Sequence, residues 1–300
     1  MQQAKMILLR HGQCEGGNIL RGKTDVALTP LGVATMEASV KKLGGALQAA
    51  PLTIYSSPLI RCQQFAQNLV ADINQNRSFS QQLNANEPVN KREVDCQTSL
   101  LAEVIQMPQF QEVDFGDWDG QTFDALYQHD GQAVDRYWTN PWKHTPPNGE
   151  TMLEFEARVT NGLAEVSGQL AAQLSSLKQL NEQVSAESSL ASAPEPEPDS
   201  DSDTDFDNGT ATENEKATAL IVTHGGVIRC IMSHILGLEQ CAGLYSQLAI
   251  DYGATVVIDV YWPELAVTKQ SVNCASEIES MQSMTKPADS KPVYRLHWPS

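Results

Sequence analysis

The sequence contains no stretch of about 18 uninterrupted apolar residues, which is the length that a membrane-spanning helix requires. Its first residues also lack the charged, apolar and small-residue pattern of a secretory signal peptide. These absences argue against a membrane protein and predict a cytoplasmic one. The chain of 300 residues is long enough to bury a large core, and we expect a single domain over residues 1–300.

Cysteines are few and scattered, and no two of them form a CxxC pair. The six positions are Cys14, Cys62, Cys96, Cys230, Cys241 and Cys274. This spacing is typical of reduced thiols rather than of a disulfide framework or a zinc site. The sequence therefore predicts free thiols and no bound metal at these residues.

Basic residues are outnumbered, 20 against 37 acidic ones, and the net charge of −17 argues against a nucleic-acid surface. Much of this charge is local, because eleven acidic residues and one lysine lie in the segment 182–216. From about Ala186 to Thr218 apolar residues are rare, so we expect a disordered acidic insert, and such runs are usually solvated spacers. A second polar stretch, Asn74 to Arg92, predicts another loop insertion.

Short apolar runs alternate with helical patterns along the rest of the chain. The predicted strands are Lys5–Arg10, Leu52–Ser57, Ala219–His224 and Thr255–Trp262, and "VYRLHW" near the end predicts an edge strand. The second and third runs are almost continuously apolar, which is typical of parallel strands that are covered on both faces.

Helix signals lie between these strands. Thr29-Pro30 predicts a helix start, because threonine caps well and proline is favoured at the first helical position, and Ser57-Pro58 repeats this pattern. Apolar residues at steps of three and four from Phe155 to Leu177 predict a long amphipathic helix. The alternation indicates an α/β fold, a doubly wound and mostly parallel sheet with helices on both faces.

Cationic and titratable side chains follow three of the predicted strands. Arg10 and His11 end the first, Arg61 follows the second, and His224 with two glycines ends the third. In an open α/β sheet ligands bind beyond the carboxyl ends of the strands, where helix N-termini also favour phosphate. Each residue alone would be typical of a structural histidine or a solvated arginine. Together they predict a site for a dianion.

These residues lie in four motifs, "LLRHG", "SSPLIRCQQFA", "QEVDFGDWDG" and "IVTHGGVIR". In this order and spacing the motifs resemble those of the histidine phosphatases, the phosphoglycerate mutase-like superfamily. The resemblance covers nearly all of the chain except the acidic insert, the 74–92 loop and the tail. It implies a phosphoglycerate mutase-like fold and a two-step reaction through a phosphorylated histidine, without metal or cofactor.

The resemblance also implies a role for each matching residue. His11 would be the nucleophile, with one ring nitrogen unprotonated and the other held by an acceptor. Arg10, Arg61 and His224 would neutralise the phosphoryl oxygens. The family's general acid precedes the Phe-Gly dipeptide by three residues, which is Glu112 here. Composition alone does not separate this residue from the three aspartates that follow it.

The motif after His11 departs from that of many family members. Cys14 and Gly17 stand where those members have threonine and asparagine, and Asn18 lies one position late. The usual phosphate contacts therefore cannot be assigned to Cys14 or Asn18. The roles of these two residues and of Gln13 stay open.

Two further segments, "LRGKTDVALTPLG" and "DRYWTNPWKHTPPNGETMLEFEARV", resemble the alpha-ribazole phosphatase branch. This implies removal of the 5′-phosphate of alpha-ribazole phosphate in the assembly of cobalamin. The segment from Trp138 to Glu150 would then form a wall or lid over the leaving group, or else a surface loop that packs its own tryptophans. Arg21 and Glu150 are the candidates for contacting the rest of the substrate.

Three other functions stay open at this point. A phosphoglycerate mutase needs extra cations for a second acidic group, but the segment 103–154 holds one arginine, Arg136, which favours hydrolysis. A phosphatase of broad specificity for sugar phosphates or nucleotides fits the same motifs. A non-catalytic module that binds phosphorylated ligands would need the cations but not Glu112. The expected partner is a small phosphomonoester, and the sequence predicts no particular oligomeric state.

Overall fold

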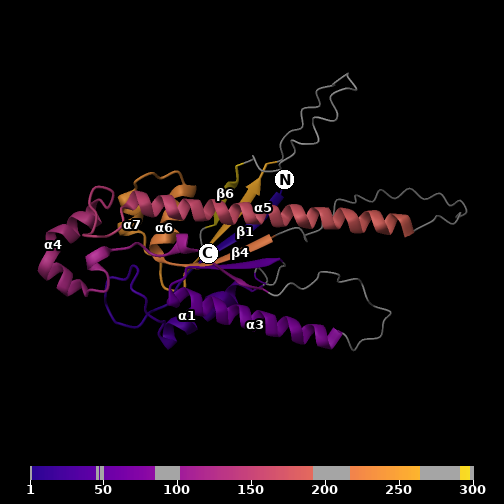
Figure 1. Cartoon of the computed structure of the whole chain (residues 1–300), viewed down its shortest axis with the longest axis horizontal. Helices are drawn as coiled ribbons and strands as arrows, with labels where there is room; N and C mark the ends of the chain where they lie inside the picture. Colours follow the sequence, from indigo (N-terminus) through magenta and orange to yellow (C-terminus); the bar gives the residue numbers. More distant parts are fainter. Residues whose placement is uncertain are drawn as a thin grey trace, which may run out of the picture.

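The structure is a computed structural model that describes residues 2–44, 47, 51–84, 102–191, 217–263 and 291–297. Figure 1 shows the arrangement of its helices and strands. In chain order the elements are β1 (Gln2–Arg10), α1 (Pro30–Leu43), β2 (Leu52–Ser56), α3 (Ile60–Asn84), β3 (Val104–Gln106), the 3-10 helices η2 (Pro108–Phe110) and η3 (Gly116–Trp118), α4 (Phe123–Thr139), α5 (Met152–Ala191), β4 (Ala217–Thr223), α6 (Gly225–Ile235), α7 (Ala242–Gln247), β5 (Thr255–Trp262) and β6 (Val293–His297).

The strands form one mixed sheet in the order β3-β2-β4-β1-β5-β6. Strands β3, β2, β4 and β1 are mutually parallel, whereas β5 pairs antiparallel with β1 and β6 pairs antiparallel with β5. The α/β, mostly parallel sheet expected from the sequence is confirmed. The "VYRLHW" strand is also present, and it lies at the edge of the sheet as β6.

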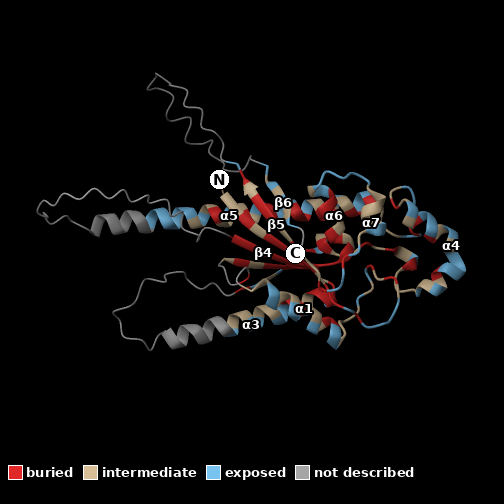
Figure 2. Ribbon diagram, turned by 180° about the vertical axis from the view of Figure 1, so that it is seen from behind, coloured by how far each residue is buried: buried red, intermediate tan, exposed pale blue. Residues whose placement is uncertain are grey.

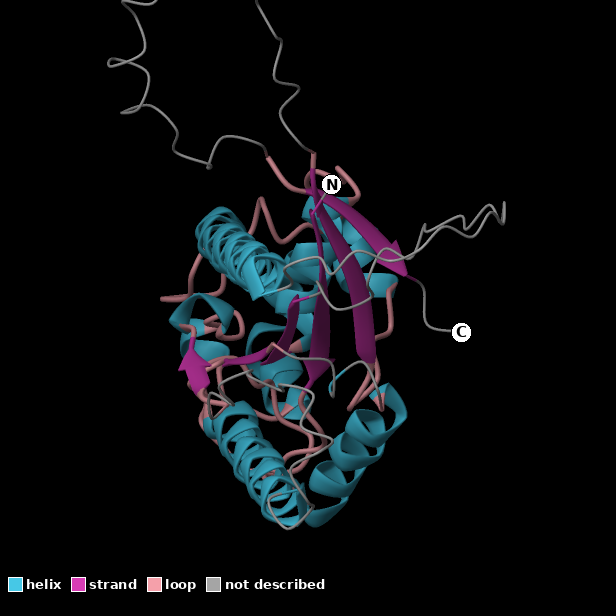
Figure 3. Ribbon diagram, turned by 90° about the vertical axis from the view of Figure 1, so that its right-hand side faces the viewer, coloured by secondary structure: helices cyan, strands magenta, loops and turns pink. Residues whose placement is uncertain are grey.

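Helices cover both faces of the sheet (Figure 3). Successive side chains of a strand point to opposite faces, so each central strand supplies two cores. Met6 and Leu8 of β1 pack in one core with α5 and α6, and Ile7 and Leu9 pack in the other with α1 and α3. Every residue of β4 is buried (Figure 2), which explains its almost continuously apolar sequence.

The two predicted helix starts differ. Thr29 caps α1, with its hydroxyl accepting from the amide of Gly32 at 3.0 Å, and proline follows at the first helical position. The prediction for Ser57-Pro58 was two residues early, because α3 begins at Ile60. The Ser57 hydroxyl still accepts from the amide of Leu59 at 3.3 Å, in the turn before the helix.

The two predicted insertions begin later than expected. Helix α3 continues to Asn84, and the Asn74 amide group pairs with the main chain of Ala102 through two hydrogen bonds of 2.9 and 3.0 Å. Helix α5 likewise continues to Ala191, because polar residues such as Gln, Glu and Ser tolerate a helix that packing has already started. The rest of both predictions, residues 85–92 and 192–216, lies outside the described residues. Of the helices that the structure describes, none combines the length and apolarity needed to cross a membrane.

Candidate active site

The strand register brings three chain segments together at the carboxyl edge of the sheet. The amide of His11 donates to the carbonyl of Thr223 at 2.9 Å, and the amide of Ser57 donates to the carbonyl of Val222 at 3.0 Å. Residues that follow β1, β4 and β2 therefore lie side by side. The rings of His11 and His224 meet edge to face, with centroids 5.1 Å apart.

His11 is held as a neutral imidazole with one free nitrogen. Its side chain is buried, and Nδ1 lies 2.8 Å from the carbonyl oxygen of Gly12. A carbonyl only accepts, so Nδ1 carries the proton and Nε2 keeps its lone pair. Burial, and then the nearby Arg61 guanidinium, lower the pKa of His11 to about 3. The expected acceptor for one ring nitrogen of His11 is therefore present, and its role as nucleophile stays a prediction.

The depressed pKa of His11 makes the fold sensitive to acid. The ordinary pKa is 6.5 and the folded value is about 3, so the unfolded chain binds more protons between these values. The free energy of unfolding should therefore fall as the pH drops through this window. Urea titrations at about pH 7.5 and about pH 5 should show a smaller fall for His11→Asn than for the unmodified protein. An unchanged pH dependence would show that His11 does not titrate as described.

Arg61 and His224 form a buried hydrogen-bonded unit behind His11. The Arg61 guanidinium donates to the carbonyls of Gly22 and Thr24 at 2.7 and 2.8 Å and to Nδ1 of His224 at 3.3 Å. Since Nδ1 of His224 accepts, its Nε2 donates to the Ser57 hydroxyl at 2.8 Å. Burial, and then Arg61, lower the pKa of His224 well below its usual range. At neutral pH His224 is therefore uncharged, and its part in binding the phosphoryl oxygens stays a prediction.

Arg10 has a donor that no described residue uses. One of its terminal nitrogens donates to the carbonyl of Ile250, and its guanidinium lies 4.3 Å from the ring centre of Tyr252. Its Nε is buried and has no hydrogen-bond partner among the described residues. This nitrogen lies beside Gly225, in the first turn of α6. Unused donors near a helix N-terminus are suited to an anion.

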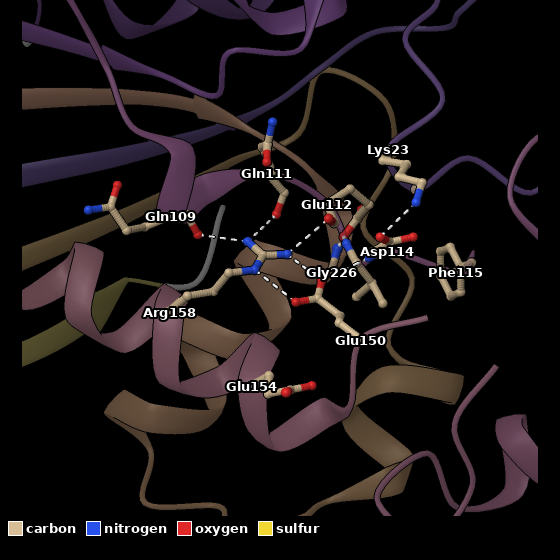
Figure 4. A network of polar contacts seen from close by, with 12 residues as sticks. Lys23, Gln109, Gln111, Glu112, Asp114, Phe115, Glu150, Glu154, Arg158 and Gly226 are labelled. Carbon is tan, nitrogen blue, oxygen red and sulfur yellow. Dashed lines mark hydrogen bonds and ion pairs between the residues drawn. The ribbon is translucent and has the colours of Figure 1, made fainter. Parts of the chain in front are cut away.

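Glu112 contacts the same turn at Gly226 (Figure 4). Its carboxylate accepts from the amide of Gly226 at 3.1 Å and from the amide of Val113 at 3.1 Å. A side chain at position 226 would overlap the Glu112 carboxylate, so the second glycine of the "THGG" motif permits this contact. Glu112, the acid predicted from the motif, therefore lies at the same turn of α6 as the Arg10 Nε, whereas Asp114, Asp117 and Asp119 bind other groups of the protein.

A pocket of about 180 Å³ opens next to Glu112. Its lining combines two arginines with aromatic and aliphatic side chains: Leu20, Arg21, Glu112, Val113, Phe115, Tyr137, Trp138, Pro141, Met152, Gly226, Arg229, Tyr245 and Ser246. The start of the Trp138–Glu150 segment is therefore a wall of this pocket. Trp142, in contrast, packs its ring edge to face on Tyr245 and donates to Glu156 at 3.1 Å.

Arg21 and Glu150, the two residues predicted to contact the rest of the substrate, lie in different places. Arg21 lies at the pocket, where it donates to the carbonyl of Glu15 at 2.8 Å. Glu150 does not line the pocket, and its carboxylate binds Arg158 and accepts from the amide of Asp114, so its contact with a substrate stays a prediction.

The residues after His11 that differ from the family motif lie in different environments. Cys14 is buried with its sulfur 3.5 Å from Nδ1 of His11, and burial raises the pKa of its thiol. Gln13 and Asn18 are exposed. The described cysteines, Cys14, Cys62, Cys230 and Cys241, are all free. Within the described part of the chain, His, Cys, Asp and Glu side chains form no group of three or more that could hold a metal ion.

Three residues of the site region were not predicted from the sequence. Ser57 was assigned to a helix cap, but it also holds His224. Arg229 lines the pocket and donates to the carbonyl of Leu248 at 2.7 and 3.0 Å. Arg158 binds Glu150 and the main chain around Glu112. The sequence held no local signal for Arg158, because its main-chain partners lie 46 to 49 residues away along the chain.

Comparisons with known proteins agree with this architecture. A family model of the histidine phosphatase superfamily (branch 1) matches residues 6–84, 93–174 and 206–271. A 2,3-bisphosphoglycerate-dependent phosphoglycerate mutase of Bartonella henselae is 28% identical over 156 residues, which are 51% of this chain and only 64% of the mutase.

Solved structures show the same fold. A protein described as mycobacterial hydrolase 2 superposes with a TM-score of 0.58 at 20% identity, covering 99% of this chain and 91% of that one. A mycobacterial glucosyl-3-phosphoglycerate phosphatase superposes with a TM-score of 0.55 at 19% identity, covering 87% and 92%. The family-model match extends over most of the sequence and includes every motif that forms the site, so this chain belongs to branch 1 of the histidine phosphatase superfamily.

Proposed function

We propose that the protein is a phosphomonoester hydrolase in which His11 carries the phosphoryl group between two half-reactions. The observation that carries this proposal is the state of His11, a buried neutral imidazole whose Nδ1 is bound to the Gly12 carbonyl and whose Nε2 is free. Such a nitrogen is a nucleophile, and the adjacent arginines supply the charge that a phosphate dianion requires.

The first half-reaction transfers the phosphoryl group to the enzyme. The unused Arg10 Nε and the Arg61 guanidinium hold the phosphoryl oxygens. The Nε2 lone pair of His11 attacks phosphorus as the bond to the alcohol oxygen breaks. Glu112 enters protonated and gives its proton to that oxygen, so that a neutral alcohol leaves.

The second half-reaction regenerates the enzyme. The Glu112 carboxylate, now ionised, takes a proton from a water molecule that attacks the phosphohistidine. The nitrogen–phosphorus bond breaks, inorganic phosphate leaves, and Nε2 recovers its lone pair. Glu112 ends the cycle protonated, as it began, so each turnover consumes one phosphomonoester and one water.

The pocket beyond Glu112 supports a specific leaving group. Aromatic rings of Phe115, Tyr137, Trp138 and Tyr245 line it, and Arg21 lies at its edge. Apolar walls with few polar groups suit a flat ring on the leaving alcohol. The proposed substrate is therefore alpha-ribazole 5′-phosphate, in agreement with the resemblance of the sequence to that branch.

A second candidate rests on the two arginines of the same pocket. Arg21 and Arg229 both line it, and two guanidinium groups could bind a second acidic group of a phosphoglycerate. A comparison of kcat/KM among alpha-ribazole 5′-phosphate, 3-phosphoglycerate and common sugar phosphates separates the two. We expect alpha-ribazole 5′-phosphate to be preferred by about tenfold or more, with release of inorganic phosphate. A preference for 3-phosphoglycerate, or phosphoryl transfer in place of release, would reject this substrate.

The proposed chemistry uses no metal ion, so activity should survive chelation. Dialysis against EDTA is expected to leave kcat/KM for nitrophenyl phosphate unchanged. In the proposed mechanism His11 is the nucleophile in place of a metal-bound water, and the arginines stabilise the phosphoryl charge in place of a metal ion. A metal-dependent phosphatase assayed in parallel controls for complete chelation. Loss of activity that added Mg²⁺ or Zn²⁺ restores would contradict the mechanism.

A further inference from the structure

Arg158 of α5 uses every donor of its guanidinium within the protein. An arginine side chain has five N–H groups, and five hydrogen bonds are present. Nε and one terminal nitrogen donate to the two carboxylate oxygens of Glu150 at 2.9 and 2.5 Å. The remaining three bonds, at 2.8–2.9 Å, go to the main-chain carbonyls of Gln109, Gln111 and Glu112.

These bonds hold a segment that has little regular structure of its own. Between β3 and α4 the chain forms only the short helices η2 and η3, so most of its carbonyls lack a helix or sheet partner. Arg158 binds three of those carbonyls, and Glu150 accepts from the amide of Asp114 at 2.8 Å. The backbone is therefore held on both sides of Glu112 (Figure 4).

Neither residue of this pair is placed to touch a substrate. Arg158 and Glu150 do not line the pocket, and their side chains are 25% and 16% exposed. The Arg158 guanidinium also stacks 4.8 Å from the ring centre of Phe155, in the buried core of α5. The planar, permanently charged guanidinium group can donate to three carbonyls and a carboxylate at once. A lysine ammonium group cannot reproduce this set of hydrogen bonds.

We propose that Arg158 and Glu150 are positioning residues for general acid catalysis, which fix the backbone so that the Glu112 carboxylate meets the leaving oxygen. This inference rests on the proposed role of Glu112. A displacement of about 1 Å at a reacting group can cost about 10²-fold in rate. The acid step is therefore the step that loss of the Arg158 contacts should impair.

The test separates positioning of the acid from general support of the fold. The measured quantity is kcat/KM for a simple alkyl phosphate divided by kcat/KM for nitrophenyl phosphate. A nitrophenolate leaves without a proton, whereas an alkoxide needs one, so loss of acid catalysis lowers this ratio. A loss of folded protein lowers both rates by the same factor and leaves the ratio unchanged.

Arg158→Lys is expected to lower the ratio by about 10- to 100-fold, and Glu150→Gln to lower it in the same direction. Arg136→Lys is the matched control, because Arg136 is exposed on α4 and should leave the ratio unchanged. If Glu112→Gln lowers the ratio but Arg158→Lys and Glu150→Gln do not, the positioning role is overturned while the acid role stands. If Glu112→Gln leaves the ratio unchanged, the acid role fails and the positioning role fails with it.

Discussion

His11→Ala is expected to lower kcat by about 10⁴-fold or more for every phosphomonoester, whatever its leaving group. The neighbouring imidazole of His224 does not replace His11 as the nucleophile, because both of its ring nitrogens are hydrogen-bonded, to Arg61 and to Ser57. Cys14 does not replace it, because burial raises the pKa of its thiol and keeps it protonated. Steady-state assays with nitrophenyl phosphate and with an alkyl phosphate measure the loss.

The control for this variant is His129→Ala, at an exposed histidine of α4. It should retain full activity. Binding of inorganic phosphate to the His11→Ala protein, followed by thermal shift, tests that Arg10 and Arg61 are still in place. Activity within tenfold of the unmodified protein would remove His11 as the nucleophile.

Glu112→Gln should produce a loss that depends on the leaving group. General acid catalysis contributes about 10²–10⁴-fold, so kcat/KM for alkyl phosphates should fall by this factor. For nitrophenyl phosphate, kcat/KM should fall far less, because it reports the first half-reaction and nitrophenolate departs unprotonated. The glutamine preserves the size of the side chain and its acceptor for the Gly226 amide, so the site should keep its shape.

Glu103→Gln, an exposed carboxylate before β3, is the control and should change neither rate. The leaving-group series is best extended over several aryl phosphates, so that the slope of log kcat/KM against leaving-group pKa is compared between proteins. A steeper slope in Glu112→Gln supports the acid role. Parallel slopes would mean that Glu112 holds the site together but donates no proton.

The convergence of Arg10, His11 and His224 could be predicted from the sequence because it follows from topology. Arg10, His11 and His224 end central strands, and ends of neighbouring parallel strands must meet at one edge of the sheet. The strand register then places His11 beside His224. Glu112 was different, since its segment is irregular and only the family motif distinguished it from the aspartates nearby.

Other features depended on contacts that no local pattern encodes. Glu150 lies just before α5 and Arg158 lies within it. Nothing in the local sequence pattern shows that their side chains form an ion pair. The neutral state of His224 results from its complete burial against Arg61. Helices α3 and α5 extend beyond the apolar pattern that predicted them, because no glycine or proline ends them before Asn84 and Ala191.

The central claim is that phosphate becomes bonded to His11 during turnover, and it is tested most directly by trapping that species. Glu112→Gln mixed with nitrophenyl phosphate should form the phosphoenzyme and then hydrolyse it slowly, because the base that activates water is gone. Quenching in alkali, digestion and mass spectrometry should locate one phosphoryl group on the His11 peptide, and acid should remove it. A phosphoryl group on any other residue, or an unmodified chain during a stoichiometric burst of nitrophenolate, would contradict the account.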